Sequence, residues 1–169
     1  GLLEETAAAF AARQRFLVKA APLIAAPIPY ARIKKVWHDL VALSERYAVP
    51  KRSLLLCALI SATAAHPSRN PALALLKPRS NYADKHAFNA LADLRALDIL
   101  IAASTDFPDR RVALLTEDRA LAQYWVGLQT HSYRRDGSSI HYKINPHRAL
   151  FARVSEKEQS EMLHLLSQG

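Results

Sequence analysis

Acidic side chains gather around one short apolar segment of this 169-residue chain. Asp98 begins one apolar run, and Thr116, Glu117 and Asp118 end the next, which spans residues 112–115. Carboxylates that follow a buried strand lie where open α/β sheets usually bind ligands and carry out their chemistry. We therefore expect the reactive groups of this protein to lie in this stretch.

The charges around these acids are distributed unevenly along the chain. The net charge is +8, and residues 6–38 and 46–83 each contain six Lys or Arg and no Asp or Glu. Seven of the fifteen acids then fall within residues 84–118. Cations that bind phosphates, placed on both sides of carboxylates that bind a metal, suit a metal-dependent nuclease. The alternative is ordinary solvated charge on helix faces.

The elements that would position these groups follow from the hydrophobic pattern. Helical spacing of apolar residues predicts helices over residues 5–20, 31–48, 54–65 and 82–104, another that begins at Asp118, and a last one capped by Ser155. Residues 111–116 are predicted to form a buried strand. Alternating residues around Asp136-Gly137 predict a β-hairpin over residues 132–144. Helices that alternate with a buried strand indicate a single α/β domain.

The frame from Asp98 to Asp118 reads D-x-L-I-A-A-S followed by V-A-L-L-T-x-D, and it resembles the PIN-domain ribonuclease family. The resemblance implies a helix-rich three-layer α/β/α sandwich with a small, mainly parallel sheet, to which the C-terminal β-hairpin is added. It also implies that Asp98 and Asp118 bind Mg²⁺ or Mn²⁺, that Thr116 orients the Asp118 carboxylate or a water, and that the protein hydrolyses RNA. Two carboxylates alone form a poor Mg²⁺ site, so Glu117, Asp93 or a residue upstream of Gly1 is expected to add an oxygen.

Each of these residues also has a simpler interpretation. Asp118 has the position of a helix N-cap, while Asp98 and Asp93 fit the exposed face of a helix. Arg79 and His86, with six residues between them, resemble the metal-independent motif of the HEPN ribonuclease family, although the predicted strands argue against that all-helical fold.

Basic residues in two regions are the candidates for nucleic-acid binding. Lys77 and Arg79 lie in a loop, while Arg134, Arg135 and Lys143 alternate with aromatic residues on the predicted hairpin. Such a ribbon would hold phosphates and stack bases, and RNA is expected ahead of DNA. The alternatives are an edge hairpin kept soluble by its charge and, for the whole chain, a non-catalytic basic module that binds nucleic acid or protein.

The remaining composition bears on the compartment. The apolar runs are shorter than the roughly 18 residues of a membrane span, so no membrane partner is expected. Cys57, the single cysteine, lies within an apolar run and is expected to be buried. Because one cysteine cannot form an intramolecular disulfide, a reducing, cytoplasmic location is predicted. The chain starts at Gly1 instead of a methionine, and native residues are expected to precede it.

Overall fold

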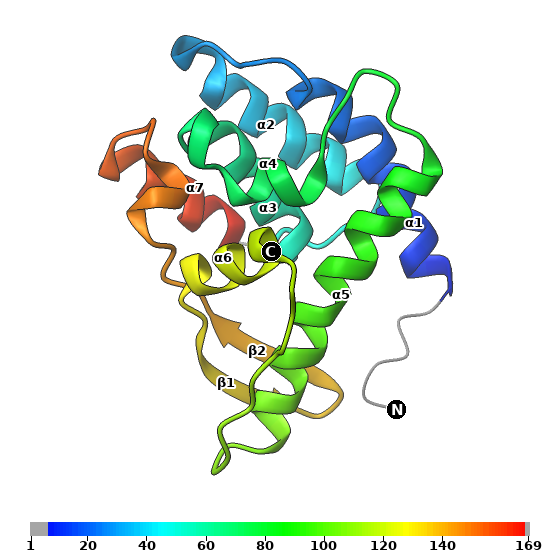
Figure 1. Ribbon diagram of the computed structural model, residues 1–169, viewed down its shortest axis with the longest axis vertical. Helices are drawn as coiled ribbons and strands as arrows, with labels where there is room; N and C mark the ends of the chain where they lie inside the picture. The colour runs from blue at the N-terminus through cyan, green and yellow to red at the C-terminus, as the bar shows by residue number, and fades with distance from the viewer. Residues whose placement is uncertain (1–6, 168–169) are drawn as a thin grey trace.

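Helices surround a buried central helix in the computed structural model, which describes residues 7–167 (Figure 1). Short 3₁₀ helices connect some of the elements. In chain order the elements are α1 (Ala7–Ala20), η1 (Ala21–Ile24), α2 (Tyr30–Arg46), α3 (Leu54–Ala64), η2 (Pro67–Arg69), α4 (Pro71–Leu76), α5 (Asp84–Asp106), α6 (Arg119–Leu128), β1 (His131–Asp136), β2 (Ser139–Lys143), η3 (Arg148–Phe151) and α7 (Glu156–Ser167). The first two residues of the helix predicted over 5–20 lie outside the described residues.

The central helix is α3, and all eleven of its residues are buried. Its sequence is apolar on every face, so water is unfavourable on every side of it and other helices must cover it. Ser53 starts the helix, because its hydroxyl accepts a hydrogen bond from the Leu56 N–H at 3.2 Å. Cys57 is buried within this helix, as the sequence predicts.

The neighbouring helix α2 has one apolar stripe. Ile33, Val36, Trp37 and Leu40 recur at helical spacing and are all buried, as the periodicity predicts. The Trp37 indole N–H donates a 2.6 Å hydrogen bond to the Thr63 hydroxyl of α3, which satisfies a buried polar group at the centre of the core. This contact fixes how α2 is seated on α3.

The predicted fold class is wrong in its main feature. Among the described residues, the sheet consists of β1 and β2 alone, which are antiparallel; there is no parallel sheet and therefore no three-layer α/β/α sandwich. The β-hairpin itself is confirmed, with its turn at Asp136-Gly137. Residues 111–116, predicted as a buried strand, lie in no helix or strand, and Leu115 is fully exposed. The amino-acid composition of these residues favours a strand, but no described strand lies beside them to pair with.

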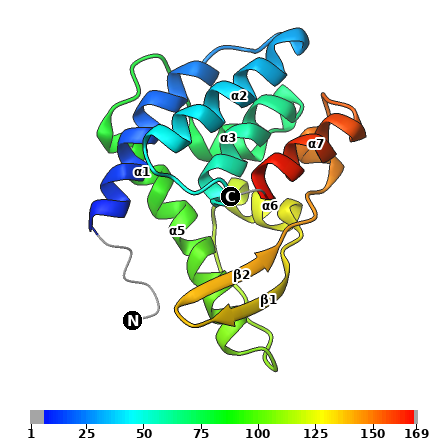
Figure 2. The same ribbon diagram turned by 180° about the vertical axis from the view of Figure 1, so that it is seen from behind.

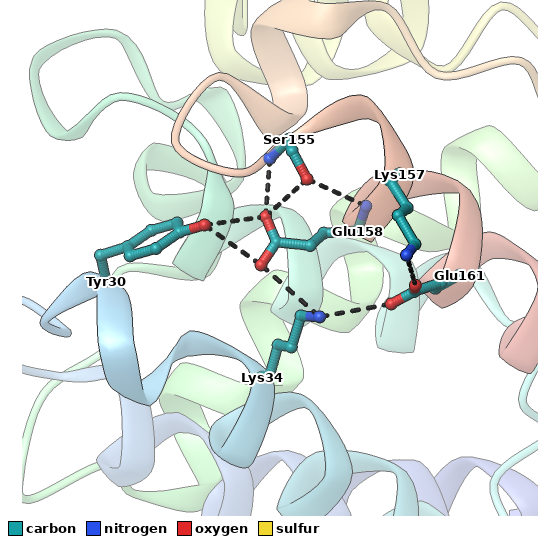
Figure 3. Close-up of polar contacts among 6 residues, drawn as sticks. All are labelled: Tyr30, Lys34, Ser155, Lys157, Glu158 and Glu161. Carbon is teal, nitrogen blue, oxygen red and sulfur yellow. Dashed lines mark hydrogen bonds and ion pairs between the residues drawn. The ribbon is translucent and has the colours of Figure 1, made fainter.

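A polar network fixes the last helix, α7, on α2 (Figure 3). The Tyr30 hydroxyl donates to both oxygens of Glu158, at 3.0 and 3.2 Å, and Lys34 Nζ lies 3.3 Å from Glu161 and 3.6 Å from Glu158. The predicted capping box is present, since Glu158 accepts from the Ser155 N–H and Ser155 accepts from the Glu158 N–H. The network therefore sets the direction in which α7 runs. Among residues 7–167, no helix combines the length and hydrophobicity needed to cross a lipid bilayer.

Candidate functional site

A cleft of about 980 Å³ lies between the β-hairpin, the start of α3 and the last turn of α7. Figure 2 shows the hairpin in front of the lower part of α5, with the end of α7 above it. Of the side chains in the described part of the chain that line this cleft, those that can carry charge near neutral pH are basic residues or histidines, and none is Asp or Glu. They are Lys51, Arg52, His131, Arg134, His141 and Lys143. We call this feature the cationic cleft.

The pairing of the hairpin explains why four of these side chains share a face. Arg134 lies directly opposite His141, and His131 lies opposite Lys143. Residues opposite each other project from the same face of an antiparallel pair, as do residues two apart on one strand. His131 and Arg134 are three apart, so strict alternation would separate them.

An irregularity in β1 removes that separation. The register shifts between His131 and Arg134, which marks a β-bulge, and Ser132 within it has a left-handed φ of 57°. The extra residue of a bulge shifts the alternation by one position. As a result, both side chains project on the face that also carries His141 and Lys143.

The opposite face of the hairpin holds it to the helices. Arg135 Nε and Nη2 both donate to Asp106 Oδ1 at the end of α5, at 2.9 and 2.6 Å. The Tyr142 hydroxyl donates to the Arg52 carbonyl at 3.4 Å, and burial raises the pKa of Tyr142 well above its usual value. Because the Tyr142 phenol stays protonated, it remains a donor to the segment that forms the other wall of the cleft.

Two cations of the cleft have no acidic partner within residues 7–167. Arg134 and Lys143 form no ion pair there, whereas Lys51 Nζ lies 2.8 Å from Glu45. The Arg52 guanidinium donates to the Ser167 carbonyl, which joins the start of α3 to the end of α7. Arg134 and Lys143 are thus the cations most available to an anionic ligand.

Of the residues predicted to bind a metal, Asp98 lies on one side of α5. Its carboxylate is 3.4 Å from Arg13 of α1, and its negative charge contributes to the raised pKa of Tyr142 on the hairpin. The structure therefore places Asp98 between α1 and the hairpin.

Asp93 and Asp118 lie near each other in a different place. Partial burial is the main cause that raises the pKa of Asp93; the charge of Asp118 raises it further, and Lys77 lowers it. Five residues separate Asp93 from Asp98, and a helix turns through about 140° beyond one full turn over that distance. The two acids of α5 therefore project in different directions.

The acidic end of the unpaired segment has a structural role. Asp118 caps α6, because its Oδ1 accepts a 2.9 Å hydrogen bond from the Leu121 N–H. Thr116 accepts from the backbone N–H of Asp118 at 3.0 Å, so it holds the backbone of Asp118 and leaves its carboxylate untouched. Glu117 is exposed. The N-cap interpretation of Asp118 is therefore confirmed.

These acids do not assemble a complete set of ligands. Mg²⁺ requires octahedral oxygen coordination, yet residues 7–167 contain no group of three or more Asp, Glu, His or Cys side chains placed to hold a metal. Lys77 already supplies positive charge near Asp93. Metal binding by Asp98, Asp118 and Asp93, and catalysis with Glu117 and Thr116, stay predictions.

The loop before α5 lies apart from the cationic cleft, because neither Lys77 nor Arg79 lines it. Arg79 Nε donates to the Lys77 carbonyl at 3.4 Å, and His86 Nδ1 accepts from the Ala83 N–H at 2.9 Å. Burial first, and then the charges of Arg79 and Lys85, lower the pKa of His86. The structure thus brings Arg79 and His86 together, but one nitrogen of the imidazole caps α5.

Comparisons with protein-family models, with curated proteins and with solved structures gave no match. The evidence for a functional site therefore comes from the geometry of the cleft alone. Sequence reasoning identified Arg134 and Lys143 but missed Lys51 and Arg52. Their only local signal is a pair of adjacent cations just before the Ser53 cap, where the first turn of α3 begins.

Proposed function

We propose that this protein binds single-stranded RNA in the cationic cleft. The observation that supports the proposal is the lining, in which Lys51, Arg52, Arg134 and Lys143 are joined by two histidines and, among residues 7–167, by no Asp or Glu. Glu45 compensates Lys51, but Arg134 and Lys143 have no acidic partner within residues 7–167, and like charges held together without such partners favour an anionic ligand. Phosphates along a nucleic-acid backbone repeat at a spacing that engages several such cations at once.

The form of the cleft favours a single strand over a duplex. Its volume of about 980 Å³ lies near the upper limit of about 1,000 Å³ for ordinary ligand pockets, which suits a few nucleotides. A duplex presents its phosphates on a wide convex surface, whereas a single strand can bend into a concavity. Tyr142 lines the cleft but is half-buried, and its hydroxyl is bonded to the Arg52 carbonyl, so phosphate contacts should dominate over base stacking and sequence preference should be weak.

Neutral polar groups beside the cations favour RNA over DNA. Ser53, Ser132 and Asn145 also line the cleft, and their side chains can exchange hydrogen bonds with a 2′-hydroxyl group, which DNA lacks. The proposal is limited to binding, because no side chain of residues 7–167 that lines the cleft is a carboxylate able to hold a metal beside a bound phosphate.

The test is a binding titration with a fluorescein-labelled single-stranded RNA of about 12 nucleotides, followed by fluorescence anisotropy at several salt concentrations. The variant Arg134→Ala/Lys143→Ala should bind at least about tenfold more weakly, and the slope of log K against log salt should shrink by about 1.4. The matched control is Lys19→Ala/Lys85→Ala, which removes two exposed cations outside the cleft and should change affinity by less than about twofold.

Two results would overturn the proposal. One is equal loss of affinity in both double variants, which would indicate that net charge alone attracts RNA. The other is wild-type protein that does not bind RNA at low salt. Single-stranded DNA of the same sequence should bind more weakly than RNA if the 2′-hydroxyl contacts form.

A further inference from the structure

Residues 111–115 belong to the connection from α5 to α6 and lie in no helix or strand (Figure 1). None of their N–H or C=O groups is hydrogen bonded to another residue within 7–167. Leu114 is 37% exposed and Leu115 is 100% exposed. An exposed apolar segment whose backbone groups are unpaired is a template for pairing with a further strand.

The charges at the two ends of this segment indicate which strand would pair with it. Arg110 and Arg111 precede the apolar residues, and Glu117 and Asp118 follow them. Arg110, Arg111 and Glu117 are exposed and form no ion pair within the described part of the chain. A second copy in antiparallel orientation brings the basic end of each strand to the acidic end of the other, whereas a parallel copy would place like charges side by side.

We propose that two copies of this protein associate through antiparallel pairing of residues 111–117 across a two-fold axis. The charges set the register: Arg111 of one copy lies opposite Glu117 of the other, so Leu114 lies opposite itself and Leu115 opposite Ala113. The small Ala113 side chain leaves room for the exposed Leu115. Such an interface uses the same surface on both copies and closes after two, as most symmetric dimers do.

The surroundings of the segment leave it accessible to a second copy. Figure 1 shows the connection from α5 to α6 crossing in front of the lower half of α5, and Figure 2 shows the β-hairpin in front of that same part of the helix from behind. The segment and the hairpin therefore lie on opposite sides of α5. A dimer formed by the segment leaves the cationic cleft of each copy open, and it is independent of RNA binding.

Charge reversal tests this interface. Arg111→Glu places Glu opposite Glu at both ends of its own dimer, and Glu117→Arg places Arg opposite Arg. By sedimentation velocity at low salt, wild-type protein should be dimeric and each single variant monomeric. An equimolar mixture of the two variants should form a dimer again, because each variant restores opposite charges only with the other.

Three outcomes would overturn the proposal: a wild-type monomer throughout the micromolar range, single variants that dimerise as wild type does, or a mixture that stays monomeric. Circular dichroism of each variant checks that the helices are retained. Any of the three outcomes would mean that residues 111–117 do not pair with a second copy of this protein.

Cross-linking tests the register separately. Opposite residues of an antiparallel pair have Cα atoms about 4.5–5.5 Å apart, within the range of about 4.4–6.8 Å that a disulfide spans. In a Cys57→Ser background, Leu114→Cys should give a covalent dimer on mild oxidation. Ala113→Cys and Leu115→Cys are the matched controls, and equal cross-linking of all three would contradict this register.

Discussion

Arg134 of β1 lies directly opposite His141 of β2, and both side chains line the cationic cleft. The bulge adds His131 to the same face, opposite Lys143. A two-stranded ribbon on its own is only marginally stable, so this arrangement depends on the packing of the other face against α5. One face of the hairpin therefore carries Arg134, His141 and Lys143, while the other carries the Arg135 contact to α5 together with Ile140 and Tyr142, which also line the cleft.

The bulge gives the first prediction. Ser132 has a φ of 57°, which glycine adopts freely and other residues adopt at a cost of about 1 kcal/mol. Ser132→Gly should raise the free energy of unfolding by about 0.5–1 kcal/mol and leave RNA affinity within about twofold. Ser132→Val should lower the unfolding free energy by about 1 kcal/mol or more, because a β-branched residue resists this conformation, and should weaken RNA binding. Urea denaturation measures the free energy of unfolding, and fluorescence anisotropy measures RNA affinity. If Ser132→Val bound RNA as wild type does, the bulge would not be needed to arrange the side chains of the cleft.

Arg134 and Arg135 are adjacent but should respond differently to removal, although the sequence suggests nucleic-acid binding for both. The guanidinium of Arg135 is committed to Asp106, so Arg135→Ala should lower the free energy of unfolding by about 1 kcal/mol and speed amide exchange in the hairpin. Arg134→Ala should change stability by less than about 0.5 kcal/mol while weakening RNA binding. Equal effects of the two variants on stability would contradict this division of roles.

The helices could be predicted from the sequence because their signals are local. The stripe of α2, the apolar run of α3 and the caps at Ser53, Asp118 and Ser155 depend on residues within a few positions of each other. The hairpin could be predicted for the same reason, since the Asp136-Gly137 turn specifies pairing between adjacent strands.

The sheet and the cleft depend on contacts between distant residues. Residues 111–116 have the composition of a strand, but composition does not state whether a second strand reaches them, and none does within the described part of the chain. The cationic cleft joins residues near 52, 134 and 166, and the bulge that aligns His131 with Arg134 has no local signature. The sequence thus predicts the cations of the hairpin, but it does not predict that Lys51 and Arg52 lie opposite them in the same cleft.

The network between α2 and α7 predicts how stability depends on acid. Hydrogen bonds from the backbone and hydroxyl of Ser155 are the main causes that lower the pKa of Glu158 from 4.5 to about 2. A carboxyl whose pKa is lower in the folded than in the unfolded state stabilises the fold above the unfolded pKa, and this contribution is lost as the pH falls toward the folded pKa. Wild-type protein should therefore lose stability between about pH 4.5 and pH 2, and Glu158→Gln should lose less over this range.

The cap itself provides the comparison for that experiment. Ser155→Ala removes the hydroxyl partner of Glu158 and should lower the free energy of unfolding by about 1 kcal/mol at pH 7. Lys157→Ala changes an exposed residue of the same helix that lies 4.0 Å from Glu161 and should have little effect. Thermal melts of wild type and all three variants across pH measure these effects. If Glu158→Gln and wild type lost stability in parallel as the pH fell, Glu158 would not be the cause of the acid dependence.

A divalent metal should have little effect on this protein. Lys77 lies near Asp93, and Asp98 is paired with Arg13 on another side of α5. We expect Mn²⁺ to change the melting temperature of wild-type protein by less than about 1 °C. Asp118→Asn is the control, because Asn preserves the cap of α6. A larger increase in wild type that is absent in Asp118→Asn would support the metal site that the PIN resemblance implies.

Asp93 should destabilise the fold at neutral pH. Its pKa is raised above 3.8 by partial burial and then by the charge of Asp118, so ionisation is less favourable in the folded than in the unfolded state. For a carboxyl with a raised pKa, the stability lost on ionisation develops as the pH rises from the unfolded pKa through the folded pKa, and it is complete above the latter. Asp93→Asn should therefore raise the melting temperature at pH 7 by about 1–3 °C and have no effect near pH 3. The control is Asp84→Asn, which alters an exposed acid in the first turn of the same helix. This variant should lower stability slightly, because it removes negative charge from the amino end of the helix dipole. If Asp93→Asn instead destabilised the protein at pH 7, the Asp93 carboxylate would have to be held by a favourable partner.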